Sequence, residues 1–342
     1  MRFLSIKLVL AAGLLALVPF VASADTGFYQ GAIFGVSTGA DGTLLVADDS
    51  QGVVNGDDGS LIAALPGVTD VASRSGGGLW AITSAGDGTQ KLYLIRNGQA
   101  TEFADLWAFE QKKNPHPALV ESNPFDVADI GRAEAAVADA AGNTLLKVNK
   151  HGKVKLVAVL PDELVSTANI KGLAGCDGDP IPDLADFCGL PPMMPAEPVA
   201  TSVAIGPDGA YYVGELKGFP APTGASRIWR IEPNAQNATC GKSPKCSVVF
   251  DGFTSIIDLA FGPDGRLYVV QIEDNSWFAL ELGEDFAVGG SVHACDLATG
   301  DCEEVVSGLP ILTAIAFRDD DSLWGATWSL IPGMADVTLL TP

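Results

Sequence analysis

The chain of 342 residues carries a formal net charge of −22, from 42 acidic and 20 basic residues. Such an excess of negative charge argues against nucleic acid and anionic membrane surfaces as partners. Two interpretations of the charge stay open: solubility outside the cell, or binding of cations. Apolar residues make up 47% of the chain, which excludes an intrinsically disordered protein.

The first segment, residues 1–24, has the pattern of a secretory signal. Arg2 and Lys7 form the basic start, an apolar run covers residues 8–21, and Ala22-Ser23-Ala24 is a small-residue cleavage site. An uncleaved membrane anchor is the alternative, but the apolar run is short for a bilayer span. We therefore expect a secreted or periplasmic protein with no membrane span after signal cleavage and a single domain over residues 25–342.

The rest of the chain is built from a repeated hairpin. The best copies are Thr201–Glu215 (TSVAIGPDGAYYVGE) and Ile257–Gln271 (IDLAFGPDGRLYVVQ). In each copy, alternating apolar residues predict two strands, and Gly-Pro-Asp-Gly predicts the tight turn between them. Weaker copies begin near residues 34, 69, 125 and 313. The six copies lie at steps of 35, 56, 76, 56 and 56 residues between aligned positions.

Each copy is followed by residues for further strands. After Thr83 come residues 91–96, the turn Asn97-Gly98 and residues 100–106, and Asn-Gly is a strong hairpin signal. A four-stranded unit repeated at this spacing is typical of a propeller blade. The sequence therefore predicts an all-β, six-bladed β-propeller of four-stranded blades. Residues 28–34 are a candidate for closing the ring, in a register that is left open.

The connections between strands predict where a functional surface lies. When a chain runs outward through strands A to D of a blade, the A–B and C–D turns share one face, and the B–C loops and D–A connections share the other. All four long connections are of the second kind: 107–123, 161–199, 217–225 and 274–289. Because ligand sites collect on loops carried by a rigid scaffold, this long-loop face is the expected surface for a small molecule or a protein partner.

Two of these connections allow a local prediction. Residues 107–113 are expected to form one or two helical turns that end before Asn114-Pro115. The proline-rich segment 161–199 is expected to lack regular structure and to drape across the face, either as a lid or as a spacer.

Six cysteines behind an export signal predict disulfide bonds. Proximity in the sequence favours Cys176–Cys188, Cys240–Cys246 and Cys295–Cys302. The last two pairs would each lock a turn between outer strands of a blade. A metal site made from the cysteines is the alternative, and the absence of a Cys-x-x-Cys pair disfavours it.

Aligning the copies brings oxygen-bearing side chains into two columns. Asp70, Asp126 and Asp258 share one position of strand A; the far end of strand B carries Asp48, Thr83, Asp139, Glu215, Gln271 and Thr327. We expect both columns to lie toward the long-loop face. Such oxygens suit a hard cation such as Ca²⁺, with Asp48, Asp139 and Glu215 as candidate metal ligands. The alternative is structural: each acid binds the backbone of the next blade.

Candidate ligand-binding residues come from these columns, with Glu273 added because it is expected at the loop-face end of a neighbouring blade. They are Asp70, Asp126, Asp258, Glu215, Gln271 and Glu273. Only three histidines are present, and no Ser-His-Asp or Cys-His set is visible. Glu215 and Glu273 are the candidate acid and base if burial raises their pKa values. The aromatic residues of the long loops could either wall a small-molecule pocket or pack the loops onto the blades.

Several stretches of the sequence resemble a known family. They are ADLWAFEQKKNP (104–115), ESNPFDVA (121–128), VATSVAIGPDGAYYVGELKGFP (199–220) and FTSIIDLAFGPDGRLYV (253–269). These stretches are similar to ScyD/ScyE-type proteins of the scytonemin cluster, and Gly-Pro-Asp-Gly-x-Leu-Tyr-Val is shared with NHL-type and lactonase-type propellers. The resemblance implies a secreted or periplasmic six-bladed propeller. It implies no established reaction and no catalytic residues.

Two main functions follow as hypotheses. The first is a secreted module that binds a ligand or partner on the long-loop face. The second is a lactonase-like or condensing enzyme that uses channel carboxylates, with Ca²⁺ as a possible cofactor. A quinone-cofactor dehydrogenase is a third hypothesis, which the scarcity of histidine disfavours.

Overall fold

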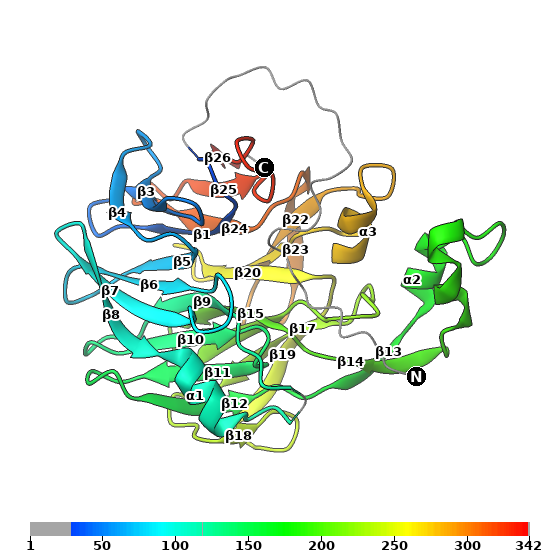
Figure 1. Cartoon of the computed structure of the whole chain (residues 1–342), viewed down its shortest axis with the longest axis horizontal. Coiled ribbons are helices and arrows are strands. Elements are labelled where there is room, and N and C mark those ends of the chain that lie inside the picture. The colour runs from blue at the N-terminus through cyan, green and yellow to red at the C-terminus, as the bar shows by residue number, and fades with distance from the viewer. Residues whose placement is uncertain (1–28, 118, 341–342) are drawn as a thin grey trace.

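The computed structural model describes residues 29–117 and 119–340, and the expected signal at 1–24 lies outside them. The described residues form an all-β propeller of six antiparallel blades, which confirms the predicted architecture (Figure 1). Each blade begins with its innermost strand, strand A, and the chain then runs outward. Within the described residues, no helix is long and apolar enough to cross a membrane.

The first three blades hold the following strands. Blade 1 contains β1 (Ile33–Thr38), β2 (Leu44–Asp48), β3 (Gly52–Asn55) and β4 (Leu61–Ala64). Blade 2 contains β5 (Val68–Ser73), β6 (Leu79–Thr83), β7 (Lys91–Arg96) and β8 (Gln99–Asp105). Blade 3 contains β9 (Pro124–Asp129), β10 (Ala135–Asp139), β11 (Thr144–Val148) and β12 (Val154–Val159).

The last three blades continue the pattern. Blade 4 contains β15 (Ala200–Ile205), β16 (Tyr211–Glu215), β17 (Ser226–Ile231) and β19 (Cys246–Phe253). Blade 5 contains β20 (Ile256–Phe261), β21 (Leu267–Gln271), β22 (Gly290–Cys295) and β23 (Cys302–Leu309). Blade 6 contains β24 (Ala314–Phe317), β25 (Leu323–Thr327) and β26 (Asp336–Leu339), three strands among the described residues.

The Gly-Pro-Asp-Gly hairpin forms as its residues predict. In blade 4, Ile205 pairs with Tyr211 and Val203 with Val213. Gly209 has a φ of 76°, a conformation that glycine adopts without steric cost, and its N–H donates to the Gly206 carbonyl at 2.9 Å. The turn therefore fixes the register of strands A and B, and with it the direction in which each channel residue points.

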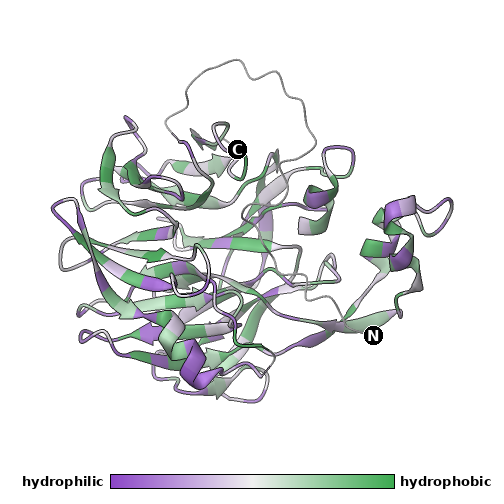
Figure 2. Ribbon diagram, in the orientation of Figure 1, coloured by the Kyte–Doolittle hydropathy of each residue, from purple (hydrophilic) through white to green (hydrophobic). Residues whose placement is uncertain are grey.

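Two kinds of contact join neighbouring blades. Apolar clusters fill the space between sheets, and Figure 2 shows the strands as predominantly apolar. The second contact comes from threonines one position before the aspartate column. Thr69 Oγ1 donates to the Pro124 carbonyl (2.9 Å), Thr201 Oγ1 to that of Ile256 (2.7 Å), and Thr313 Oγ1 to that of Ile33 (2.7 Å). The last bond joins blade 6 to blade 1 and helps to close the ring.

Residues 161–199, called the arm below, contain regular structure, so the expectation of an irregular segment was wrong. The arm holds β13 (Glu163–Ser166), α2 (Ala168–Leu173), the 3₁₀ helix η1 (Pro182–Gly189) and β14 (Met193–Ala196). Strands β13 and β14 pair as an antiparallel ribbon that reaches out from the blades, with α2 near its tip (Figure 1). The prolines lie at the ends of these elements or on the ribbon's exposed edge, where a missing N–H is tolerated.

The arm packs onto two other long connections. Asn169 Nδ2 donates to the Ala221 carbonyl (2.8 Å) and to Ser276 Oγ (2.9 Å). The Phe187 ring contacts those of Phe219 and Phe278, with centroids 5.9 and 5.5 Å apart. These aromatic residues therefore pack the loops together, one of the two roles considered for them. The helix α3 (Trp277–Leu282) belongs to this contact.

Other local predictions are confirmed or refined by the structure. A helix, α1 (Leu106–Lys113), ends at Asn114 as expected. All three predicted disulfides are present: Cys176–Cys188, Cys240–Cys246 and Cys295–Cys302. Cys240–Cys246 lies next to a further strand. Cys240 directly follows β18 (Ala238–Thr239), which pairs in parallel with β12 and adds a fifth strand to blade 3.

Candidate ligand site in the central channel

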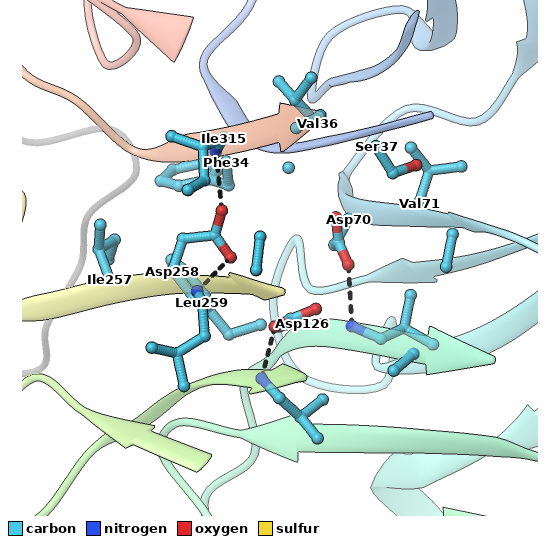
Figure 3. Close-up of a pocket in the computed structure, with 18 of the residues that line it drawn as sticks. Phe34, Val36, Ser37, Asp70, Val71, Asp126, Ile257, Asp258, Leu259 and Ile315 are labelled. Carbon is cyan, nitrogen blue, oxygen red and sulfur yellow. Dashed lines mark hydrogen bonds between the residues drawn. The ribbon is translucent and has the colours of Figure 1, made fainter. Parts of the chain in front are cut away.

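A cavity of about 290 Å³ lies on the propeller axis. Strand A of every blade contributes to its lining, so the cavity is a property of the ring and not of any single loop. Three of the lining residues are the aspartates of the first column, Asp70, Asp126 and Asp258, which Figure 3 shows pointing into the same region from three strands. The structure thus brings this column together as the sequence alignment predicted.

Each of these aspartates accepts a backbone N–H from the next blade. Asp70 Oδ2 accepts from Val127 N (2.8 Å), Asp126 Oδ2 from Val203 N (2.6 Å), and Asp258 Oδ2 from Ile315 N (2.8 Å) (Figure 3). The structural alternative considered for this column therefore holds. Because a carboxyl oxygen has further lone pairs, these bonds leave the groups able to contact a ligand as well.

Gly35 occupies the aspartate position in blade 1, and the structure shows why. A Cβ at Gly35 would lie 1.9 Å from Asp70 Oδ1. Only glycine allows the Asp70 carboxyl to lie this close to strand A of blade 1. Glycine in place of aspartate at position 35 is therefore required by the geometry of the site.

Burial and mutual repulsion perturb the three carboxyls. Burial raises the pKa of Asp70 to about 7. Burial, with the neighbouring charge of Asp126, raises the pKa of Asp258 to about 7. The pKa of Asp126 lies well above its usual range because the group is buried and shares a hydrogen bond with Asp70. The cluster therefore retains protons near neutral pH, where isolated aspartates are ionised.

The end of the cavity toward the long loops is closed. Phe34, Phe125 and Ile257 are buried there, and the two phenylalanine rings are in edge contact at 5.6 Å. They belong to an apolar cluster that continues to Leu216 and Trp277 of the long connections. This layer separates the aspartates from the long-loop face, whereas the sequence led us to expect them toward that face.

The opposite end of the cavity is open. Lining residues at the C-terminal ends of strand A are half-buried, in contrast to the buried N-terminal ends: Thr38, Ala72, Ala128, Phe261 and Phe317. Strand A runs from the long-loop face to the A–B turns. A ligand would therefore reach the aspartates from the side of the A–B turns.

The second column does not converge on the cavity. Its members lie at the B–C ends of different blades, and several of them bond the loops around them. Asp48 Oδ1 and Oδ2 accept from Gly31 N (3.0 Å) and Gln30 N (2.7 Å). Burial opposes ionisation of Asp48, but hydrogen bonds from Gln51, Gln30 and Ser50 outweigh it and hold its pKa below the usual range.

Asp139, Gln271 and Glu273 organise loops in the same way. Asp139 accepts from Ser122 Oγ (2.6 Å) and Asn123 N (2.7 Å), and burial raises its pKa. Gln271 Nε2 donates to Asp274 Oδ1 (2.6 Å), and Glu273 accepts from Val288 N (2.8 Å) and Gly289 N (2.9 Å). These contacts close the long B–C loop of blade 5.

Glu215 belongs to a buried ionic network. Lys217 Nζ lies 2.6 Å from Glu215 Oε2 and 2.7 Å from Glu163 Oε2, and Arg227 Nη1 lies 2.5 Å from Glu163 Oε1. Trp229 Nε1 also donates to Glu215. Burial raises the pKa of Glu215 to about 7, although the charge of Lys217 opposes this. The network ties the arm to blade 4, because Glu163 is part of β13.

The candidate metal ligands are not brought together. Asp48, Asp139 and Glu215 lie on blades 1, 3 and 4. Across residues 29–117 and 119–340, no group of three or more His, Cys, Asp or Glu side chains is arranged to hold a metal ion. Binding of Ca²⁺ stays a prediction, without a ligand set in this part of the chain.

Sequence reasoning missed two groups of residues. The threonine clamps at 69, 201 and 313 recur one position before the aspartate column, a signal that the alignment of copies already contained. The pairing of Lys217 with Glu163 had no such signal, because the arm that carries Glu163 is an insertion outside the repeat.

Comparisons with known proteins support the fold. No family model and no curated protein matches the chain. Among solved structures, virginiamycin B lyase from Staphylococcus aureus is 14% identical, with a TM-score of 0.52 over 91% of this chain and 85% of that one. This match supports the β-propeller fold.

Two further matches are to proteins described as enzymes. The PQQ-bound aldose sugar dehydrogenase from Streptomyces coelicolor is 13% identical, with a TM-score of 0.52 over 91% of this chain and 95% of that one. A putative gluconolactonase is 12% identical, with a TM-score of 0.51 over 92% and 91% of the two chains. At such identities the similarity concerns the fold alone, because the same propeller supports unrelated functions.

Proposed function

We propose that this protein is a secreted β-propeller that binds a small molecule in its central channel. The observation that carries the proposal is the cavity of about 290 Å³, closed at one end, into which carboxyls from three blades converge. A concave site with apolar walls and a few convergent polar groups is the usual form of a small-molecule site. Asp70, Asp126 and Asp258 are the polar contacts.

Secretion is supported by the three disulfides, which form and persist in oxidising compartments outside the cytosol. The signal-like pattern of residues 1–24 agrees with it. Kinship with ScyD/ScyE-type propellers is supported by the stretches at 199–220 and 253–269, which form strands A and B of blades 4 and 5.

The long-loop face is better suited to a protein partner than to the small molecule. The arm and the aromatic residues beneath it occupy this face over blades 4 and 5. On the arm, Leu164 and Met193 are 69% and 49% exposed, and exposed apolar side chains of this kind are common at partner-binding surfaces.

A screen of small molecules by thermal shift tests the proposal. Lactones, small aromatic compounds and Ca²⁺ are tested on the wild-type chain and on Asp126→Asn, with Asp301→Asn as the control because Asp301 lies in an exposed turn of blade 5. A compound at 100 times its Kd stabilises the fold by about 2.7 kcal/mol. We expect a stabilising compound whose effect is lost in Asp126→Asn and kept in Asp301→Asn. Stabilisation that both variants retain would place the site elsewhere.

Acid–base catalysis in the channel is a second candidate function. It is favoured by the shared hydrogen bond of Asp70 and Asp126, since two coupled carboxyls with raised pKa values can act as acid and base near neutral pH. Lactone hydrolysis followed by proton release, with and without chelator, tests it. Hydrolysis that Asp126→Asn abolishes would support an enzyme, and its loss on chelation would support the calcium-dependent form.

A further inference from the structure

The aspartates of the channel have no cationic side chain beside them in the cavity lining. Among the residues that line the cavity, the titratable groups are the three aspartates, and no Lys, Arg or His is among them. Buried Glu215, by contrast, has the cation of Lys217 at 2.6 Å. Because no cationic side chain lines the cavity, these three carboxyls are harder to ionise than isolated aspartates, and a cation that enters would favour their ionised form.

The walls of the cavity are apolar and partly aromatic. Phe34 and Phe125 form the closed end, and Phe261 and Phe317 lie toward the open end. Aromatic rings attract organic cations through their quadrupoles, and this attraction increases when the cation is desolvated. The volume, about 290 Å³, corresponds to about ten water molecules, which suits a ligand of roughly that number of non-hydrogen atoms.

One further lining group has an unused hydrogen-bonding capacity. The Ser37 hydroxyl oxygen is buried, and no hydrogen-bond partner engages it among the residues that the structure describes. Buried hydroxyls are normally satisfied, by protein or by a bound molecule. Ser37 follows Val36 on strand A of blade 1, on the open side of Gly35 and the Asp70 carboxyl.

This inference rests on the proposed channel site. We propose that the ligand of the channel is a small organic cation, an amine or a quaternary ammonium compound. The ammonium group lies among Asp70, Asp126 and Asp258, and the rest of the ligand fills the aromatic part of the cavity. An inorganic divalent cation fits less well, because each aspartate already holds a backbone N–H and no convergent metal-binding group is formed within the described residues.

Binding of such a cation releases protons. In the free protein the carboxyls are partly protonated, and each one that ionises when the cation enters gives its proton to the buffer. The carboxylate then balances the positive charge of the ligand. Affinity should therefore increase with pH between 5 and 8, as ionisation of the cluster becomes easier.

The test compares cations with neutral molecules of the same shape. Choline is paired with 3,3-dimethylbutan-1-ol, in which carbon replaces the ammonium nitrogen, and phenethylamine is paired with 2-phenylethanol, in which a hydroxyl replaces the ammonium group. Binding to the full chain is measured by titration calorimetry in phosphate and in HEPES, whose different ionisation enthalpies report the number of protons released. We expect at least one cation to bind tenfold or more tightly than its neutral partner, with net proton release.

Two variants locate the effect. Asp258→Asn keeps an acceptor oxygen for the Ile315 N–H but cannot ionise, and we expect it to lose at least tenfold in cation affinity. Ala260→Leu narrows the cavity and leaves all three carboxyls in place, so it weakens binding even if the first variant folds poorly. Asp301→Asn is the control that leaves affinity unchanged.

The outcomes separate this inference from the proposed function. Neutral molecules that bind as tightly as the cations, with binding lost in Ala260→Leu, overturn the cation inference and keep the channel as the ligand site. Cations that bind without proton release, or equally well to Asp258→Asn, also overturn the inference. If neither class binds and the wider screen finds no channel ligand, both proposals fail.

Discussion

At the scale of single residues, the most demanding environment is that of Lys217. Its side chain is fully buried, with Glu215 and Glu163 at 2.6 and 2.7 Å. Lys217 also adopts a φ of 65°, which is uncommon for residues other than glycine. Its carbonyl accepts a hydrogen bond from Trp277 Nε1 at 2.8 Å, so one residue contacts blade 4, the arm and α3. A buried charge is tolerated only with such partners.

Replacing Lys217 by methionine should destabilise the protein markedly. Loss of the ammonium leaves Glu215 buried without its cation, which typically costs about 3 kcal/mol or more in free energy of unfolding. The double variant Lys217→Met/Glu215→Gln should recover part of this loss, because it removes the unpaired charge. Urea denaturation measures both. Lys155→Met, at an exposed position of β12, is the control, and equal stability of all three variants would contradict a structural role for the network.

At the scale of elements, the arm is an insertion with its own internal order. Cys176–Cys188 links the turn after α2 to η1 and closes a loop with a sequence separation of 12. It contacts the blades through Asn169 and Phe187 at one end and through Glu163 at the other. Ile170 and Leu173 of α2 also join the apolar cluster of the long connections. Insertions that lie outside the hydrogen-bonded sheets commonly open separately from the rest of a protein.

Removal of this disulfide should therefore act locally. We expect Cys176→Ser/Cys188→Ser to speed amide hydrogen exchange and proteolysis over residues 168–190 at least tenfold, with little change in the blades. Hydrogen exchange followed by mass spectrometry resolves the two regions. As a matched control, Cys295→Ser/Cys302→Ser should affect blade 5 and leave the arm unchanged. A uniform loss of protection over the whole chain would show that the arm is an integral part of the propeller.

At the scale of the whole molecule, side-chain clamps follow one another around the ring. The aspartates join blades 2 to 3, 3 to 4 and 5 to 6, and the threonines join blades 2 to 3, 4 to 5 and 6 to 1. Between blades 1 and 2, Gly35 permits direct contact with Asp70 instead. The residues proposed to hold the ligand therefore also hold the ring together.

This double role gives the stability of the protein a particular pH dependence. The pKa of Asp258 is about 7 in the folded protein and about 4 in an unfolded chain. Between these values the folded state binds more protons, so the free energy of unfolding contributed by this group decreases as pH rises and levels off above 7. As pH rises through this window, the free energy of unfolding of Asp258→Asn should increase relative to that of the wild type by about 1.4 kcal/mol per pH unit.

Urea unfolding at pH 4.5, 5.5, 6.5 and 7.5 measures the difference. Asp301→Asn, on an exposed turn, should follow the wild type at every pH. A difference between Asp258→Asn and the wild type that stays constant with pH would show that Asp258 is ionised in the folded protein throughout this range.

The repeat determined how far the sequence could predict the structure. Gly206-Pro207-Asp208-Gly209 and its counterparts specify strands A and B locally, and counting the copies gave the six blades. The aspartate column followed from the same alignment. The arm could not be predicted, because its packing depends on Phe219 and Phe278, which are distant in sequence. The closed end of the cavity was missed for a similar reason: it requires Phe34 and Phe125 of different blades to meet.

The layer formed by Phe34, Phe125 and Ile257 determines how a ligand can enter and leave the cavity. An open channel along the propeller axis would let a molecule pass from one face to the other, but this cavity has a single opening. Whatever settles inside must leave the way it came. A larger body resting on the A–B turns would act as a stopper, so that release of the contents would depend on the departure of that body.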